Sequence, residues 1–230
     1  MKKVTKKMKS HDPIRPGFSL CASEGPKSAR NGNQTKKTMK LTIKITAGLA
    51  LLTLLAGCVV PSVYPWYTAK DVRFDPALIG AWAEPDSTNA ANDHWRFEKL
   101  ESQTYKLTVQ EKEKRTEFDA RLFQLKGRLF LDCSPRERPD HSLPLHYLLK
   151  VTRIEPTLEL STLNYDWLQK LIAKDSKAVR HIVVPKKTGE SGEDDLVLTA
   201  DTSELQAFIL EHEKTEGAFG DAFVMKRFKD

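Results

Sequence analysis

Four side chains in the central part of the sequence have the chemistry to bind a metal or to act as a nucleophile with a base: Asp132, Cys133, His141 and His146. Their spacing fits no short-range zinc-binding pattern. A pair formed by Cys133 and either histidine lacks a motif that would activate the thiol. We therefore expect no metal site. His146 alternates with apolar neighbours, so we expect it to face solvent or the rim of a sheet.

Motifs that would identify an enzyme are missing from the sequence. It contains no Gly-x-Ser-x-Gly elbow, P-loop, dinucleotide fingerprint or His-Glu-x-x-His helix. The sequence thus predicts a protein that is not an enzyme and uses no cofactor. Polar clustering of histidines in one cleft would favour the enzyme alternative; the candidates are His94, His141, His146 and His181.

Charge is distributed unevenly along the 230 residues, which carry a formal net charge of +6. Residues 1–57 hold 12 of the 37 Lys and Arg side chains but only two acidic ones, Asp12 and Glu24. The remainder has 25 basic and 29 acidic side chains, so it is mildly acidic. A basic region confined to one terminus is typical of a targeting segment or an arm. We expect no nucleic-acid partner.

Residues 39–57 have the organisation of a signal peptide. Lys40 and Lys44 precede a leucine-rich run of twelve uncharged residues, and two prolines follow shortly after it. A transmembrane helix needs about 20 apolar residues, so this run is too short to span a bilayer comfortably.

Residues 1–38 are basic and polar and show no hydrophobic periodicity, as expected of a disordered leader. A complete signal peptide begins directly at Met39. We therefore expect translation to start at Met39, with residues 1–38 an upstream extension of the reading frame.

The tetrapeptide Leu55-Ala56-Gly57-Cys58 closely resembles the lipobox of bacterial lipoproteins, in which an aliphatic residue, a small residue and Gly or Ala precede a cysteine. The resemblance implies that signal peptidase recognises Leu55, Ala56 and Gly57 and cuts before Cys58. It also implies a diacylglycerol on the Cys58 sulfur and an acyl chain, such as palmitate, on the new amine. Two or three such chains anchor a protein stably, because each buried methylene contributes about 0.8 kcal/mol.

Cys58 is followed by Val59 and Val60, with no aspartate directly after the cysteine. By resemblance to lipoprotein sorting in bacteria with two membranes, this implies an anchor in the outer membrane, facing the periplasm. The alternative is an apolar core segment that ends in a cysteine by chance.

The prolines of residues 58–70 predict an extended, lipidated tether. Tyr64, Trp66 and Tyr67 have two possible places, the membrane interface or the surface of the domain. Cys133 has no expected disulfide partner, and its alternation with leucines predicts burial on an apolar face.

Residues 71–230 are expected to form one β-rich domain. Apolar residues recur at every second position, which places them on one face of a strand. Segments with this pattern are 94–99, 105–110, 116–125, 128–133, 142–154 and 157–163, with a closing strand at 222–228. Short connections between consecutive strands predict an antiparallel meander that curls.

Two helices interrupt this pattern. One covers residues 164–174 with Asn164 as its cap, and the other begins at Asp201, where Glu204 gives the spacing of a capping box. The polar, glycine-containing stretch 187–195 between them predicts a loop. The fold class is therefore mainly β with two helices (α+β).

Gly80-Ala81-Trp82 matches the Gly-x-Trp signature that opens the first strand of lipocalins and lipocalin-like barrels. This resemblance implies a closed barrel in which Trp82 packs across one end beneath Arg227 of the last strand. An open sheet flanked by helices is the alternative, with Trp82 simply a core aromatic residue.

Two functions follow from these patterns. The first is a membrane-anchored lipoprotein whose curled sheet binds a small hydrophobic molecule in an apolar pocket. The second is a structural or interaction lipoprotein that docks onto an envelope protein and needs no pocket. A cavity inside the sheet would distinguish the first function from the second.

Overall fold

The computed structural model describes residues 59–85, 87, 89–185 and 194–228. The chain divides into two compact units, Met1–Leu41 and Thr42–Asp230, and all described residues belong to the second. The expectations for the leader, the signal peptide, the start at Met39 and Cys58 therefore lie outside the described residues, as does most of the loop at 187–195.

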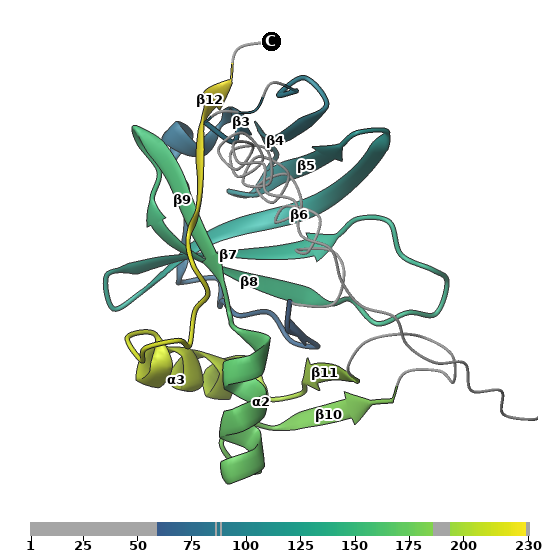
Figure 1. Cartoon of the computed structure of the whole chain (residues 1–230), viewed down its shortest axis with the longest axis vertical. Coiled ribbons are helices and arrows are strands. Elements are labelled where there is room, and N and C mark those ends of the chain that lie inside the picture. The colour runs from purple at the N-terminus through teal and green to yellow at the C-terminus, as the bar shows by residue number, and fades with distance from the viewer. Residues whose placement is uncertain (1–58, 86, 88, 186–193, 229–230) are drawn as a thin grey trace, which may run out of the picture. The chain divides into compact units, whose positions relative to one another are not determined.

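The second unit is mainly β with two α-helices, and eight of its strands close into an antiparallel barrel (Figure 1). The barrel strands are β3 (Gly80–Ala83), β4 (Asp93–Lys99), β5 (Tyr105–Glu111), β6 (Lys114–Leu125), β7 (Arg128–Pro135), β8 (His146–Arg153), β9 (Thr157–Thr162) and β12 (Phe223–Phe228). Strands β3 to β9 follow one another around the barrel, and β12 closes it by pairing with both β9 and β3. The fold class is confirmed, and the open-sheet alternative is wrong.

Local sequence explains the tight hairpins of the meander. Leu125 pairs with Arg128, so only Lys126 and Gly127 connect β6 to β7, and both have positive φ angles of 46° and 83°. A two-residue hairpin of type I′ requires positive φ at both central positions, which Gly adopts without strain. The β5–β6 hairpin is equally short, because Glu111 pairs with Lys114.

Three short strands outside the barrel extend its sheet next to β8. Strand β1 (Pro61–Ser62) pairs antiparallel with β8 and parallel with β11 (Asp195–Leu198), which in turn pairs with β10 (His181–Val184). A further short strand, β2 (Val72–Arg73), pairs with β6. The sequence analysis missed all four, because strands of two to four residues are too short to show a period.

Helices α2 (Tyr165–Lys174) and α3 (Thr202–His212) begin where the sequence predicts. The Asn164 side chain accepts a hydrogen bond from the Trp167 N–H at 3.0 Å, so it caps α2. No helix among the described residues is both long enough and apolar enough to cross a bilayer.

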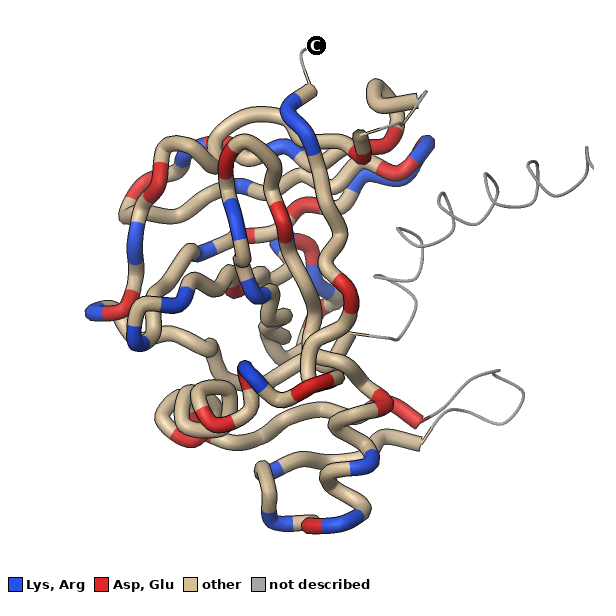
Figure 2. Tube along the Cα trace, turned by 60° about the vertical axis from the view of Figure 1, so that its left-hand side comes forward, with Lys and Arg blue, Asp and Glu red and all other residues tan. Residues whose placement is uncertain are grey.

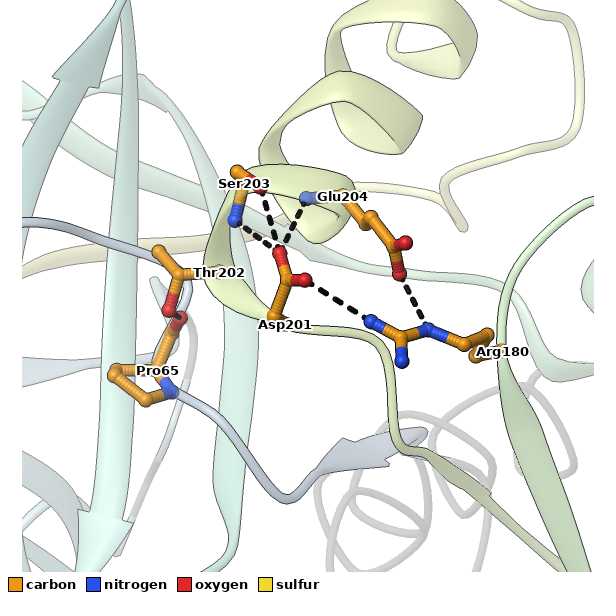
Figure 3. Close-up of polar contacts among 6 residues, drawn as sticks. All are labelled: Pro65, Arg180, Asp201, Thr202, Ser203 and Glu204. Carbon is orange, nitrogen blue, oxygen red and sulfur yellow. Dashed lines mark hydrogen bonds and ion pairs between the residues drawn. The ribbon is translucent and has the colours of Figure 1, made fainter.

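The start of α3 differs from a full capping box (Figure 3). Asp201 Oδ1 accepts the N–H groups of Ser203 at 3.0 Å and Glu204 at 3.1 Å, as a cap should. The Glu204 carboxylate instead accepts Arg180 Nε at 2.6 Å, and Asp201 Oδ2 accepts Arg180 Nη2 at 3.0 Å. Arg180 thus ties the segment before β10 to the start of α3.

The unit has two hydrophobic cores. The first fills the barrel interior with inward residues of its strands, while the second lies between the outer face of the barrel and the helices with β11. Phe123, Phe130 and Leu148 point outward from β6, β7 and β8 into this second core. Both faces of these strands are therefore buried at these points, so each strand carries apolar residues at consecutive positions there. Figure 1 shows α2, α3, β10 and β11 together on one side of the barrel.

Residues 59–70 are packed on the barrel, so the expectation of an extended tether is wrong for this segment. Trp66 is fully buried in the second core, and its N–H donates to Asp132 Oδ2 at 2.9 Å. Thr202 Oγ1 donates to the Pro65 carbonyl at 2.8 Å (Figure 3). Of the three aromatic residues whose place was left open, Trp66 docks on the domain, Tyr67 is partly buried, and Tyr64 is exposed.

Candidate functional site

One end of the barrel is closed by Trp82 and Arg227. The guanidinium carbon of Arg227 lies 4.5 Å from the centre of the Trp82 ring. Its nitrogens donate to the carbonyl oxygens of Ile79 at 2.8 Å and Ala77 at 2.5 Å, and Trp82 Nε1 donates to the Leu78 carbonyl at 3.0 Å. This is the arrangement that the resemblance to lipocalin-like barrels implies for these two positions.

The glycine of the Gly-x-Trp signature is required by this closure. Gly80 has a φ of +126°, which residues with a side chain rarely adopt. A Cβ atom at this position would lie 2.7 Å from Arg227 Nη1. The absence of a side chain at Gly80 therefore lets the Arg227 guanidinium reach over the Trp82 ring.

The opposite end of the barrel opens into a cavity of about 620 Å³. It lies among the end of β5, the start of β6, the end of β7 and the start of β8, and most of its lining is apolar. This volume falls within the range of about 300–1,000 Å³ found for small-molecule sites. Residues that line the cavity from the barrel strands include Trp95, Leu107, Val109, Phe118, Tyr147 and Leu149.

Segments outside the barrel complete the wall of the cavity. Val59 and Pro61 contribute from the N-terminal segment, Tyr165 from the start of α2, and Leu196 and Val197 from β11. Two of the four short strands that the sequence analysis missed, β1 and β11, thus take part in the site.

Trp95 carries a polar atom that has no partner. Its side chain is 6% exposed and lines the cavity from β4, yet its buried Nε1 makes no hydrogen bond. Leaving a buried donor unsatisfied costs about 1–3 kcal/mol.

Glu111 lines the cavity from the end of β5 and is buried. Burial raises the pKa of its carboxyl group, the nearby Lys114 opposes this shift, and Asp93 adds to it. Sequence alone did not single out Trp95 or Glu111. The signal was present in the period-two pattern, which puts Glu111 on the same inward face as Val109, but nothing in that pattern shows that the face lines a cavity.

Cys133 is buried and free, as expected, and it also lines the cavity. Burial raises the pKa of its thiol well above the ordinary value, and the charge of Asp132 acts in the same direction. Because the thiolate is the reactive form, Cys133 is poorly suited to act as a nucleophile.

His146 is the first residue of β8, and its side chain points away from the cavity lined by Leu145 and Tyr147, as expected, but it is only 13% exposed. Its Nδ1 lies 2.8 Å from Asp132 Oδ1, on the outer face of the barrel. Asp132 itself is buried and also accepts the Trp66 N–H. His146 and Asp132 are fourteen residues apart in sequence. The pairing of their strands, β8 and β7, brings the two side chains together.

The remaining candidates do not gather at this pair. His141 is exposed in the loop before β8, while His94 lies near the Ala90 carbonyl and His181 near the Val179 carbonyl. None of these histidines lines the cavity. Among the described residues, no group of three or more His, Cys, Asp or Glu side chains is placed to hold a metal ion.

Comparisons with known proteins add no relative to this description. No protein-family model matches the chain, and neither curated protein sequences nor solved structures give a significant match. The fold alone therefore defines the class of protein: a closed eight-stranded antiparallel barrel with two helices, consistent with a lipocalin-like barrel.

Proposed function

We propose that this protein is a bacterial lipoprotein, held to the cell envelope by lipid on Cys58, whose barrel binds a small hydrophobic molecule. The observation that supports binding is the mainly apolar cavity of about 620 Å³ inside the open end of the barrel. The interaction-lipoprotein alternative needs no such cavity, so the cavity favours ligand binding.

The lining of the cavity restricts the ligand. The mainly apolar wall calls for a molecule that is apolar over most of its surface. Displacing water from this wall contributes most of the affinity.

Cavity binding is tested with N-phenyl-1-naphthylamine, a neutral fluorophore that brightens in apolar sites. The full chain carrying Cys58→Ser removes the lipid and alters no described residue. Val109→Phe places a larger ring into the cavity, while Val224→Phe makes the same change on an outward, exposed position of β12. We expect Val109→Phe to abolish the saturable fluorescence and Val224→Phe to retain it, with near-equal melting temperatures. Equal loss or equal retention in both variants contradicts the proposal.

Lipid attachment is tested by growing bacteria that express the full chain with an alkyne-bearing palmitate analogue. We expect label on the wild type and on Cys133→Ala, and none on Cys58→Ser. The labelled wild type should fractionate with the outer membrane, as the residues after Cys58 imply. Intact mass of the natural product showing an unmodified Cys58 with its leader attached rules out the lipoprotein.

A further inference from the structure

The point at which the described chain begins lies at the mouth of the cavity. Val59 forms an isolated β-bridge with Asn164, the cap of α2, and Val59 and Pro61 both line the cavity. Pro61 also pairs with Tyr147 at the start of β8, another lining residue. The described chain therefore begins at the open end of the barrel.

Exposed apolar side chains lie on β10, which pairs with the cavity-lining strand β11. Ile182, Val183 and Val184 of β10 are 50%, 54% and 43% exposed. Each pairs with a residue that lines the cavity, Val197, Leu196 and Asp195 respectively.

The loop before β8 exposes one more large apolar residue. Leu143 is 65% exposed two residues before the lining residue Leu145. Clustered exposed apolar residues mark surfaces that contact a partner or a membrane.

The charge of the lining restricts what enters. Glu111 and Asp195 are among the lining residues, and none of the lining residues is Lys, Arg or His. Figure 2 shows acidic and basic positions interspersed over the traced chain, so this lack of cations belongs to the cavity rather than to the unit. An anionic headgroup would meet like charge from these two carboxylates, so a neutral ester or amide suits the lining better.

From the geometry of the mouth we infer that it faces the bilayer and that the cavity takes a fatty acyl chain carried on a neutral ester or amide. This inference rests on the proposed function. Val59, which directly follows the proposed lipid attachment residue in sequence, lies at the mouth, and the exposed side chains of β10 are placed to enter the bilayer interface. The chain comes from one of two sources of the same chemistry: a neighbouring membrane lipid, or the protein's own lipid on Cys58.

The test uses the full, lipidated chain in bacteria grown with a palmitic acid analogue that carries a photoreactive diazirine near its end. Growth incorporates this analogue into phospholipids and into the lipid on lipoprotein cysteines. After irradiation, peptides of the protein are examined by mass spectrometry for attached lipid. Wild type is compared with Val109→Phe, which fills the cavity, and with Val224→Phe as the matched control.

We expect cross-links on peptides covering residues 107–111 and 145–149 in the wild type and in Val224→Phe, and at least a fivefold loss in Val109→Phe. An attached phospholipid identifies the bilayer as the source, while an attached Cys58 lipopeptide identifies the protein's own lipid. Both results support the inference. Each additional methylene that enters the cavity should strengthen binding about fourfold, which shorter analogues can check.

Other outcomes separate this inference from the proposed function. If Cys58 is acylated and N-phenyl-1-naphthylamine binds in the barrel, but the strand peptides carry no lipid, the acyl-chain inference is wrong and the proposed function stands. If cross-links persist in Val109→Phe, they do not arise in the cavity and the inference is likewise wrong. If the fluorophore does not bind or Cys58 is unmodified, the proposed function itself fails.

Discussion

The substitution Gly80→Ala tests how the closed end of the barrel is built. Two separate costs are expected at this position. The backbone has a φ of +126°, and forcing a residue with a Cβ into a positive-φ conformation costs about 1–2 kcal/mol. The new Cβ would also stand 2.7 Å from Arg227 Nη1, so the guanidinium must move.

The second cost follows from what Arg227 loses when it moves. Its stack over Trp82 is worth about 0.5–1 kcal/mol at a partly exposed site. Its hydrogen bonds to Ile79 and Ala77 add about 0.5 kcal/mol each at the low end of the usual range, because the side chain is partly exposed. Together these parts predict that Gly80→Ala lowers the free energy of unfolding by about 2.5–4 kcal/mol.

Gly127 provides the matched control for this substitution. It also has a positive φ, +83°, but no atom lies within 4 Å of the position that its Cβ would occupy. Gly127→Ala should therefore cost only the backbone part, about 1–2 kcal/mol. In an Arg227→Ala background, Gly80→Ala should fall to the same value, because the clash is gone.

Urea unfolding of these variants, followed by tryptophan fluorescence, measures the differences through the transition midpoint at constant slope. Equal costs for Gly80→Ala and Gly127→Ala would refute the steric reasoning. So would a cost at Gly80 that does not change when Arg227 is removed.

Three further predictions follow from buried polar groups. Asp132→Ala removes the acceptor of the buried Trp66 N–H and should lower the free energy of unfolding by about 2–3 kcal/mol. The control Asp119→Ala breaks an exposed ion pair and should lower it by less than about 1 kcal/mol in the same urea assay. Similar values for the two variants would contradict the role given to Asp132. Because burial raises the pKa of the Cys133 thiol, thiol reagents at mildly alkaline pH should modify Cys133 far more slowly in the folded chain than after unfolding, and equal rates would contradict this. The raised pKa of Glu111 means that its ionised form destabilises the fold, so Glu111→Gln should be more stable than wild type at neutral pH. This advantage should shrink as the pH falls through the raised pKa toward about 4. A difference in unfolding free energy that is independent of pH would contradict this reasoning.

The sequence by itself determined the class of secondary structure and most of the barrel. Period-two alternation in segments such as 105–110 and 116–125 is a local property, and short connections allow consecutive strands to pair only as neighbours. Helix starts were equally local, because Asn164 and Asp201 cap the N–H groups of their own helices. The signal peptide and the lipobox, too, are linear patterns, and they remain predictions from sequence.

Only the tertiary structure decided which polar residues meet and where the barrel leaves space. His146 alternates with apolar residues along its strand, and that pattern cannot show that the outer face of β8 is covered as well; the pairing with Asp132 follows from the register of two strands. Trp66 stands in a proline-rich segment typical of a tether, yet the second core buries it completely.

The cavity shows the same limit most clearly. Trp95, Val109 and Tyr147 follow the same alternating pattern as the inward residues that fill the closed end. Whether such residues touch one another or enclose a space depends on barrel closure and on the side chains from all the other strands. That is a property of the assembled fold, so the short-range order of the amino acids cannot reveal it.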